Sequence, residues 1–395
     1  MLTYKFRLYP TTAQEQKLLG TLEACRYAYN YFVRNGYTNR NDMNYALTEL
    51  KEQEPWLNNY HSKMLQMVST QVAGARKALK ELRKKGYDAG KLRFRKYGEF
   101  DTCNTCNTCI YNQSGFGIDA PNNTLYLDRI GKIKMKIHRS IVGSIKHIAL
   151  KRKAGRWYAC ITTDNNYRMV HSFSILKPID FRKAAGIDVG IKNYAYDSDG
   201  NVTPNPENLK KMLKPLIRAQ RKVSRRVKGS QNHRKARRWF EIVHERITNR
   251  RKDFLHKLSA HYASRYDVIF LERLKVLNMV KNHSLAMSIT DAAWSTFKDM
   301  IGYKAKLMLE VESRDSTIDC SRCGNKVPKS LAIRIHRCDR CGLVMDRDYN
   351  ASLNILQRGL RSLQSLGVPQ ELRELTPVEI LIGSRKQEAH VLRRG

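Results

Sequence analysis

The segment Asp319–Leu356 reads DCSRCGNKVPKSLAIRIHRCDRCGLVMDRDYNASLNIL and combines a metal-binding pattern with a carboxylate. Its cysteines form two CxxC pairs, Cys320 with Cys323 and Cys338 with Cys341, separated by 14 residues. This spacing is typical of two zinc knuckles that close one tetrahedral site with four thiolate ligands. Four thiolates leave no open coordination position, so we expect one structural zinc ion. Four free thiols and an iron–sulfur centre are the alternatives that the spacing leaves open.

Three acidic residues stand out because each ends or begins a predicted element. Asp188 ends a strand, Glu272 ends the apolar run YDVIFL, and Asp348 opens the helix after the cysteines. Such positions can converge although the acids are 84 and 76 residues apart. Clustered carboxylates repel one another unless a cation neutralises them, and Mg²⁺ with oxygen ligands suits that role. Two such ions can stabilise the attacking and leaving oxygens of a phosphodiester, so we expect two catalytic Mg²⁺. We interpret the remaining nearby acids as turn or cap residues, namely Asp197, Asp199 and Asp346.

The charge of the chain points to a polyanionic partner. Lys and Arg number 73 against 36 Asp and Glu, which gives a formal net charge of +37 over 395 residues. A field of this sign attracts nucleic acid, with a ribosomal-type basic protein as the plain alternative. No apolar run approaches the roughly 18 residues of a membrane span, so we expect no membrane partner. Nine cysteines, an odd number, indicate a reducing compartment rather than a disulfide scaffold.

The first 180 residues change pattern twice. Residues 2–9 alternate apolar and polar side chains, as a half-buried strand does. Residues 11–86 show helical spacing, with a first helix that Thr12 and Glu15 would begin as a capping box and that Asn35-Gly36 would end. Short alternating segments follow over 91–163 and favour an antiparallel β-barrel that the first strand joins. The stretch DTCNTCNTC interrupts this region, and we interpret it as a low-complexity loop rather than half of a metal site; its cysteines are Cys103, Cys106 and Cys109.

The second half alternates strands and helices. Ala184–Val189 and Asn193–Tyr196 read as a hairpin, and residues 205–257 read as helices with a cationic surface. A buried central strand is expected at Tyr266–Leu271. Further helical patterns and a strand follow, and then the helix from about Tyr349. The helical patterns lie at about 291–307 and the strand at 308–311. The chain after Gly359 is poorly patterned, and we expect it to be irregular.

The order of these motifs resembles the TnpB family, transposon-encoded relatives of the type V CRISPR effectors. The matching residues are GIDVGIKN, then VIFLERL, then CSRCG, CDRCG and DRDYNASLNIL. YKFRLYPTTAQEQ and KGSQNHRKARR also resemble family segments, so the resemblance covers nearly the whole chain. The sequence departs from the family before Cys320, where it reads RDSTIDC and the family usually has a Thr-Ser pair nearer the cysteine. Cys103–Cys109 are a second departure.

The resemblance implies an α+β multidomain fold. Its parts would be a β-barrel wedge domain at 1–10 and 87–180, a helical recognition lobe at 11–86, and a RuvC nuclease domain of ribonuclease-H-like fold at 181–311 and 344–360. A four-cysteine zinc ribbon at 312–343 would be inserted in the nuclease domain, and 361–395 would form a C-terminal tail. By motif position, the catalytic acids and Mg²⁺ ligands would be Asp188, Glu272 and Asp348, and the zinc ligands would be Cys320, Cys323, Cys338 and Cys341.

The resemblance also implies an activity and partners. The protein would be an RNA-guided DNA endonuclease that takes a guide RNA from the transposon end and cuts double-stranded DNA next to a short transposon-adjacent motif. We expect it in the prokaryotic cytoplasm, associated with the nucleoid, as a monomer with one RNA. A cleavage-deficient RNA-guided repressor is the main alternative, but all three acids are present, which favours the enzyme. A compact type V CRISPR effector and a transposase acting directly on DNA are further alternatives.

Overall fold

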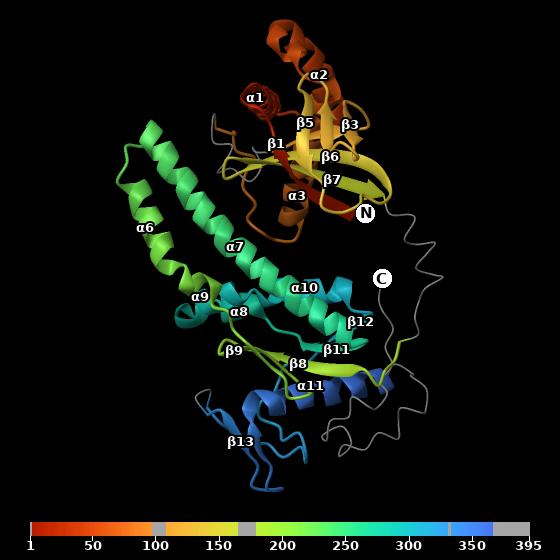
Figure 1. Cartoon of the computed structure of the whole chain (residues 1–395), viewed down its shortest axis with the longest axis vertical. Helices are drawn as coiled ribbons and strands as arrows, with labels where there is room; N and C mark the ends of the chain where they lie inside the picture. The colour runs from red at the N-terminus through yellow and green to blue at the C-terminus, as the bar shows by residue number, and fades with distance from the viewer. Residues whose placement is uncertain (1, 97–107, 165–178, 331–332, 366–395) are drawn as a thin grey trace. The chain divides into compact units, whose positions relative to one another are not determined.

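The computed structural model describes residues 2–96, 108–164, 179–330 and 333–365, and the chain divides into two compact units (Figure 1). Unit 1 comprises Met1–Ile175 and Arg226–Ile242, and unit 2 comprises Leu176–Arg225 and Val243–Gly395. The segment Arg226–Ile242, expected within the nuclease part, therefore groups with the N-terminal half. The long helix α7 (Gln231–Arg265) contributes to both units. None of the described helices is both long and apolar enough to span a membrane.

Unit 1 begins with a strand and three helices. After β1 (Leu2–Tyr9) come α1 (Thr12–Arg34), α2 (Arg40–Gln53), the 3₁₀ helix η1 (Pro55–Asn59) and α3 (Ser62–Lys84). The predicted capping box is displaced by one residue, because Thr11 caps α1 and the Gln14 side-chain oxygen, rather than that of Glu15, accepts the reciprocal bond from the Thr11 N–H. Thr11 with Gln14 and Thr12 with Glu15 both fit the capping-box pattern of Ser or Thr followed three residues later by Gln or Glu. The sequence pattern therefore does not decide between them, and the residue at which the helix begins does. Asn35 ends α1 as predicted.

The sheet of unit 1 is antiparallel and includes the first strand, as predicted. Its strand order is β2-β6-β7-β1-β5-β4-β3, and β1 pairs with β7 and β5. Phe6 and Leu8 of β1 are fully buried in one core with Leu18 and Leu22 of α1. The pairs among the described strands do not join β2 to β3, so closure into a barrel stays a prediction. The other strands are β2 (Thr108–Asn112), β3 (Phe116–Asp119), β4 (Thr124–Leu127), β5 (Gly131–Lys136), β6 (Ser144–Lys153) and β7 (Arg156–Asp164).

One predicted strand is wrong. Lys91–Lys96 carries alternating residues but no regular secondary structure, and instead Arg95 bonds through its backbone to Asn30 of α1. Side-chain amide bonds thus take the place of ladder bonds. Tyr97 lies outside the described residues, as do Cys103 and Cys106, so the loop prediction stays untested for these cysteines. For Cys109 the prediction is wrong, because Cys109 lies in β2 and is fully buried in the core of unit 1.

Unit 2 is a five-stranded mixed sheet covered on both faces. Its order is β10-β9-β8-β11-β12, with β8, β11 and β12 parallel and β8, β9 and β10 antiparallel. Strand β11 is central and buried, as its apolar sequence predicts. The strands are β8 (Ala184–Val189), β9 (Asn193–Asp197), β10 (Val202–Pro204), β11 (Val268–Glu272) and β12 (Leu307–Val311).

Helices form the outer layers of unit 2. Leu255 and Tyr262 of α7 and Phe297 of α10 pack on one face of the sheet, whereas Ile355 and Leu360 of α11 pack on the other. Figure 1 shows α10 and α11 on opposite sides of the strands. The remaining helices are α5 (Asn208–Lys211), α6 (Leu213–Ser224), α8 (Val276–Met279), α9 (His283–Ala292), α10 (Trp294–Lys304) and α11 (Arg347–Gln364).

Two helix ends differ from expectation. Helix α7 continues to Arg265 rather than 257, and α11 continues past Gly359 to Gln364. In both cases packing stabilises the additional helical residues, since Tyr262 and Leu363 are buried against the sheet. The tail that was expected to be irregular is therefore helical as far as Gln364, and 366–395 lie outside the described residues.

Candidate functional site

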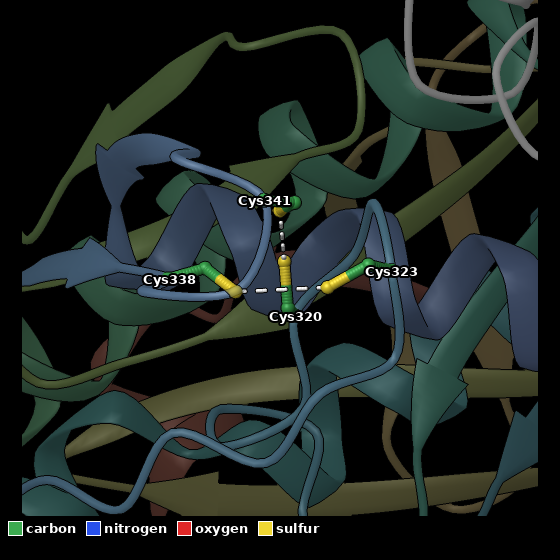
Figure 2. A group of neighbouring side chains, drawn as sticks. All are labelled: Cys320, Cys323, Cys338 and Cys341. Atoms are coloured by element: carbon green, nitrogen blue, oxygen red, sulfur yellow. Dashed lines mark hydrogen bonds between the residues drawn. The ribbon is translucent and has the colours of Figure 1, made fainter.

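The four cysteines of the ribbon converge on one point. Their sulfur atoms all lie within 4.8 Å of one another, and Cys320 Sγ is 3.6 Å from Cys341 Sγ, as Cys323 Sγ is from Cys338 Sγ (Figure 2). A tetrahedral zinc with Zn–S bonds of about 2.3 Å requires sulfurs about 3.8 Å apart, so the arrangement fits this ion.

The two knuckles have the same backbone geometry. Gly324 and Gly342 both adopt a φ of +71°, which favours glycine, and each donates its N–H to the carbonyl of the first cysteine of its pair at 2.9 Å. Strands β13 (Ile335–Arg337) and β14 (Val344–Asp346) hold the second knuckle. Burial raises the pKa of Cys338, but N–H donors of Cys341 and Arg340 bring that pKa down to about 6. A thiol that ionises this readily is a ready metal ligand.

The structure brings Asp188, Glu272 and Asp348 to the same edge of the unit 2 sheet. Leu271 lies opposite Ile187 in the parallel pair β11–β8, so the residues that follow each of them, Glu272 and Asp188, are neighbours. Asp348 lies in the first turn of α11. Burial raises the pKa of Asp188 well above its usual value, and the charges of Glu272 and Asp348 raise it further. The three acids therefore form one electrostatic cluster.

Glu272 carries an oxygen without a partner. Its Oε1 is buried and accepts no hydrogen bond from any described residue, and burial raises the pKa of this carboxyl while the Ser316 hydroxyl opposes that rise. A buried carboxylate oxygen left bare is costly, and a cation beside it would remove that cost. The donor set thus fits a hard divalent ion.

Asp348 is engaged differently from the other two acids. Its carboxylate lies 3.3 Å from Arg347 Nη2 and 3.7 Å from Arg334 Nη1. Among the described residues, only the four cysteines lie close enough together to bind one ion as they stand. The carboxylates of Asp188, Glu272 and Asp348 face a common region but are farther apart. Neither arginine was predicted as a site residue; Arg347 lies within the DRDYN motif, whereas Arg334 lies 12 residues before it.

Asp346 and Asp197, which the sequence predicted to be cap or turn residues, serve as a helix cap and a turn residue in the structure. Asp346 accepts hydrogen bonds from the N–H groups of Asp348 at 2.7 Å and Tyr349 at 3.3 Å, and so caps α11. Asp197 accepts from the N–H groups of Asp199 and Asn201 in the turn after β9. The N-cap position of Asp346 places Asp348 on the inner side of the first helical turn.

A row of amides on α11 attaches the ribbon to the sheet domain, and sequence reasoning missed it. Asn350 accepts from Ser321 N–H at 3.0 Å and donates to the Asp319 carbonyl at 2.8 Å. Asn354 donates to the Asp319 carbonyl at 2.7 Å, and Gln357 to the Ser321 carbonyl at 2.7 Å. The signal was present in the sequence, since residues 350, 354 and 357 recur at helical spacing. This face joins the first zinc knuckle to the helix that carries Asp348.

Comparison with known proteins agrees with this layout. Residues 170–283 match a family model described as a probable transposase, OrfB_IS605, residues 294–355 match a Cas12f1-like TNB domain, and residues 1–37 match a helix-turn-helix domain of the same transposase group. The two long matches contain all seven site residues.

Several curated relatives are similar in sequence. A putative RNA-guided DNA endonuclease of Streptomyces pristinaespiralis is 39% identical over 53% of this chain and 51% of its own length. The putative RNA-guided DNA endonuclease InsQ of Escherichia coli K12 is 28% identical over 90% of this chain and 92% of its own. The TnpB-like protein L79 of Acanthamoeba polyphaga mimivirus is 26% identical over 49% and 40%. The chain thus spans about half the length of the first of these relatives and nearly all of the second.

Among solved structures, CasPhi-2 (Cas12j) bound to crRNA aligns over 90% of this chain and 97% of its own at 10% identity, with a TM-score of 0.41. The sequence matches fall at the N-terminal strand and helix, the sheet of unit 2 and the ribbon, in the order that the motifs predict. The chain is thus similar to the OrfB_IS605 transposase family and to relatives named TnpB-like or putative RNA-guided DNA endonuclease.

Proposed function

We propose that this protein is an RNA-guided DNA endonuclease that cuts double-stranded DNA next to a short transposon-adjacent motif. The observation that carries the proposal is the partly buried cluster of Asp188, Glu272 and Asp348 at one sheet edge. The curated relatives named as putative RNA-guided DNA endonucleases support it. We assign the wedge, recognition, nuclease and ribbon parts to the residue ranges that the family resemblance implies.

In this mechanism the acids would hold two Mg²⁺ ions. When bound, the metal supplies activation of water and stabilisation of the phosphodiester oxygens in an in-line displacement. Asp188 and Glu272 come from neighbouring strands and fix one side of the site, and Asp348 approaches from α11. Because Asp188 is removed from much of the solvent, its carboxylate would attract a bound cation more strongly than an exposed one would. The zinc has no role in the chemistry and holds the ribbon in shape.

Nucleic acid would be held by its backbone. Helix α6 exposes Lys214, Arg218, Arg221 and Lys222, and β5 exposes Lys132, Lys134 and Lys136. Such lysines and arginines bind phosphates regardless of the base sequence. The target sequence would be recognised by base pairing with a guide RNA from the transposon end. We propose a monomer with one RNA, acting on DNA in the prokaryotic cytoplasm.

The test is to purify the protein from its host, sequence the copurified RNA and assay the matching DNA target with Mg²⁺. Asp188→Ala, Glu272→Ala and Asp348→Ala should each abolish cutting while leaving guided DNA binding nearly intact. Asp253→Ala is the matched control, because Asp253 is an exposed acid of α7 that pairs with Lys257. Absence of copurified RNA would contradict the guided mechanism. Binding without cutting by the unaltered chain would favour the repressor, and a guide that matches a CRISPR array would favour the compact effector.

A further inference from the structure

A pocket of about 360 Å³, counting the space open at its mouth, lies beside the acids of unit 2. Glu272 lines it, and so do Val189, which directly follows Asp188, and Leu271, which directly precedes Glu272. The pocket therefore begins where the proposed metal site ends.

The interior of the pocket suits a flat, neutral ring. Leu271 of β11, Val276 of α8 and Trp294 and Phe297 of α10 form its walls. Lys298 lies at the lining too, but its ammonium is tied to Glu310 at 2.7 Å, so its charge is largely neutralised. A phosphate would lose its hydration among such walls without a compensating cation. An aromatic ring would gain stacking and burial there.

Trp294 offers a hydrogen bond that nothing in the described part of the chain accepts. Its side chain is only 5% exposed, and its indole N–H is buried without an acceptor among the described residues. Buried indole N–H groups usually find a partner, because an unsatisfied donor costs free energy. A ligand with an acceptor atom at its edge would satisfy it.

The chain is held in an uncommon conformation to present Trp294. Ala293, between α9 and α10, has a φ of +52°, in the left-handed region that residues with a Cβ seldom adopt. The Tyr194 hydroxyl donates to the neighbouring Ala292 carbonyl at 3.0 Å and fixes this junction. Backbone strain of this kind is concentrated at functional sites.

We propose that this pocket receives the unstacked base of a nucleotide that flanks the phosphate being cut. The inference rests on the proposed nuclease function and adds a binding subsite to it. A base has two apolar faces for the walls and ring or carbonyl acceptors for the Trp294 N–H, and it is attached to the backbone that the acids hold through Mg²⁺. Extraction of one base from the stack would set the position of the phosphate relative to the acids.

The first test uses target DNA with one abasic nucleotide moved stepwise across the cut site, and the full chain with its guide RNA. Stacking on an aromatic side chain is worth enough that loss of the base should slow cutting about tenfold, at one position only. Trp294→Phe, which keeps the ring and removes the N–H, should slow cutting of intact DNA about fivefold and leave that abasic substrate unaffected. Equal rates for every abasic position would overturn the proposal.

The second test measures the base itself, with 2-aminopurine at the sensitive position, or at each position of a single-stranded oligonucleotide, and Ca²⁺ in place of Mg²⁺. Stacking should quench its fluorescence in the unaltered chain, and Val276→Trp, which fills the pocket, should restore it. Leu277→Trp is the matched control, since Leu277 is the next residue of α8, is 84% exposed and does not line the pocket. If no DNA is cut, the nuclease proposal fails, but quenching that Val276→Trp relieves would still establish the base pocket. Quenching that neither variant changes, or no quenching, would refute it.

Discussion

At Gly186 the backbone of the unit 2 sheet lies close against the backbone of α11, and Gly186→Ala tests whether that packing builds the acid cluster. A Cβ at this position would lie 2.3 Å from the Ser352 carbonyl oxygen and 2.4 Å from the Leu356 nitrogen, both backbone atoms of α11. Ordinary contact begins near 3.4 Å, so the helix would have to move by about 1 Å. No side-chain rotation can relieve this clash.

The expected cost follows from the length of the contact. Overpacking a core costs about 1–3 kcal/mol when side chains can adjust. Here a whole helix must withdraw, and a gap of about 1 Å forfeits a quarter to a half of each dispersion contact along it. We therefore expect Gly186→Ala to destabilise unit 2 by roughly 3 kcal/mol or more. Asp348 moves with α11, so the acid cluster should open as well.

The assay compares Gly186→Ala with Gly302→Ala in the same unit. Gly302 is an exposed glycine of α10, and its Cβ would meet only the flexible end of Met308 at 3.3 Å. Alanine is the better helix former by about 1 kcal/mol, so this control should be neutral or stabilising. Because a two-unit chain need not unfold in one step, hydrogen exchange in β8 and α11 should accompany urea unfolding. Unchanged exchange and a midpoint within 0.5 M of the unaltered protein for Gly186→Ala would refute the packing argument.

Three further predictions concern the two sites. The pKa of Asp188 is raised by folding, so the folded chain binds this proton more tightly and loses stability as pH rises above the unfolded value near 4. Asp188→Asn should therefore raise the thermal midpoint at pH 8 without Mg²⁺ by roughly 2–4 °C, with little change at pH 4, and a parallel loss at both pH values would contradict the assignment. Metal analysis should find about one zinc per chain, and Cys323→Ser should remove it and speed hydrogen exchange through the ribbon; two zinc ions per chain would indicate a second site. Asn350→Ala should leave the Ser321 N–H unpaired, at about 1–3 kcal/mol, while the Asp319 carbonyl keeps its bond from Asn354, and should weaken zinc retention against a chelator; unchanged retention would show that the Asn350 bonds are dispensable.

The sequence determined the local features. The cysteine spacing sets the thiolate cluster, because a CxxC turn with glycine after it has one backbone geometry that presents both sulfurs to the same ion. The apolar run of β11 and the alternation of β1 predicted a central strand and a half-buried strand, since periodicity follows directly from which faces are buried. The cap role of Asp346 is equally local, as it depends only on residues 346–349.

The tertiary structure decided what lies between distant residues. Asp188 and Glu272 are neighbours because β8 pairs in parallel with β11, and Asp348 joins them because α11 packs at Gly186; no local pattern encodes either contact. The failure of the predicted strand at Lys91–Lys96 has the same cause, since Asn30 of α1 takes the bonds that a sheet would have used. The base pocket likewise depends on Trp294, Leu271 and Val276 from three separate elements. Sequence fixes the chemistry that each residue can offer, and packing alone decides which residues meet.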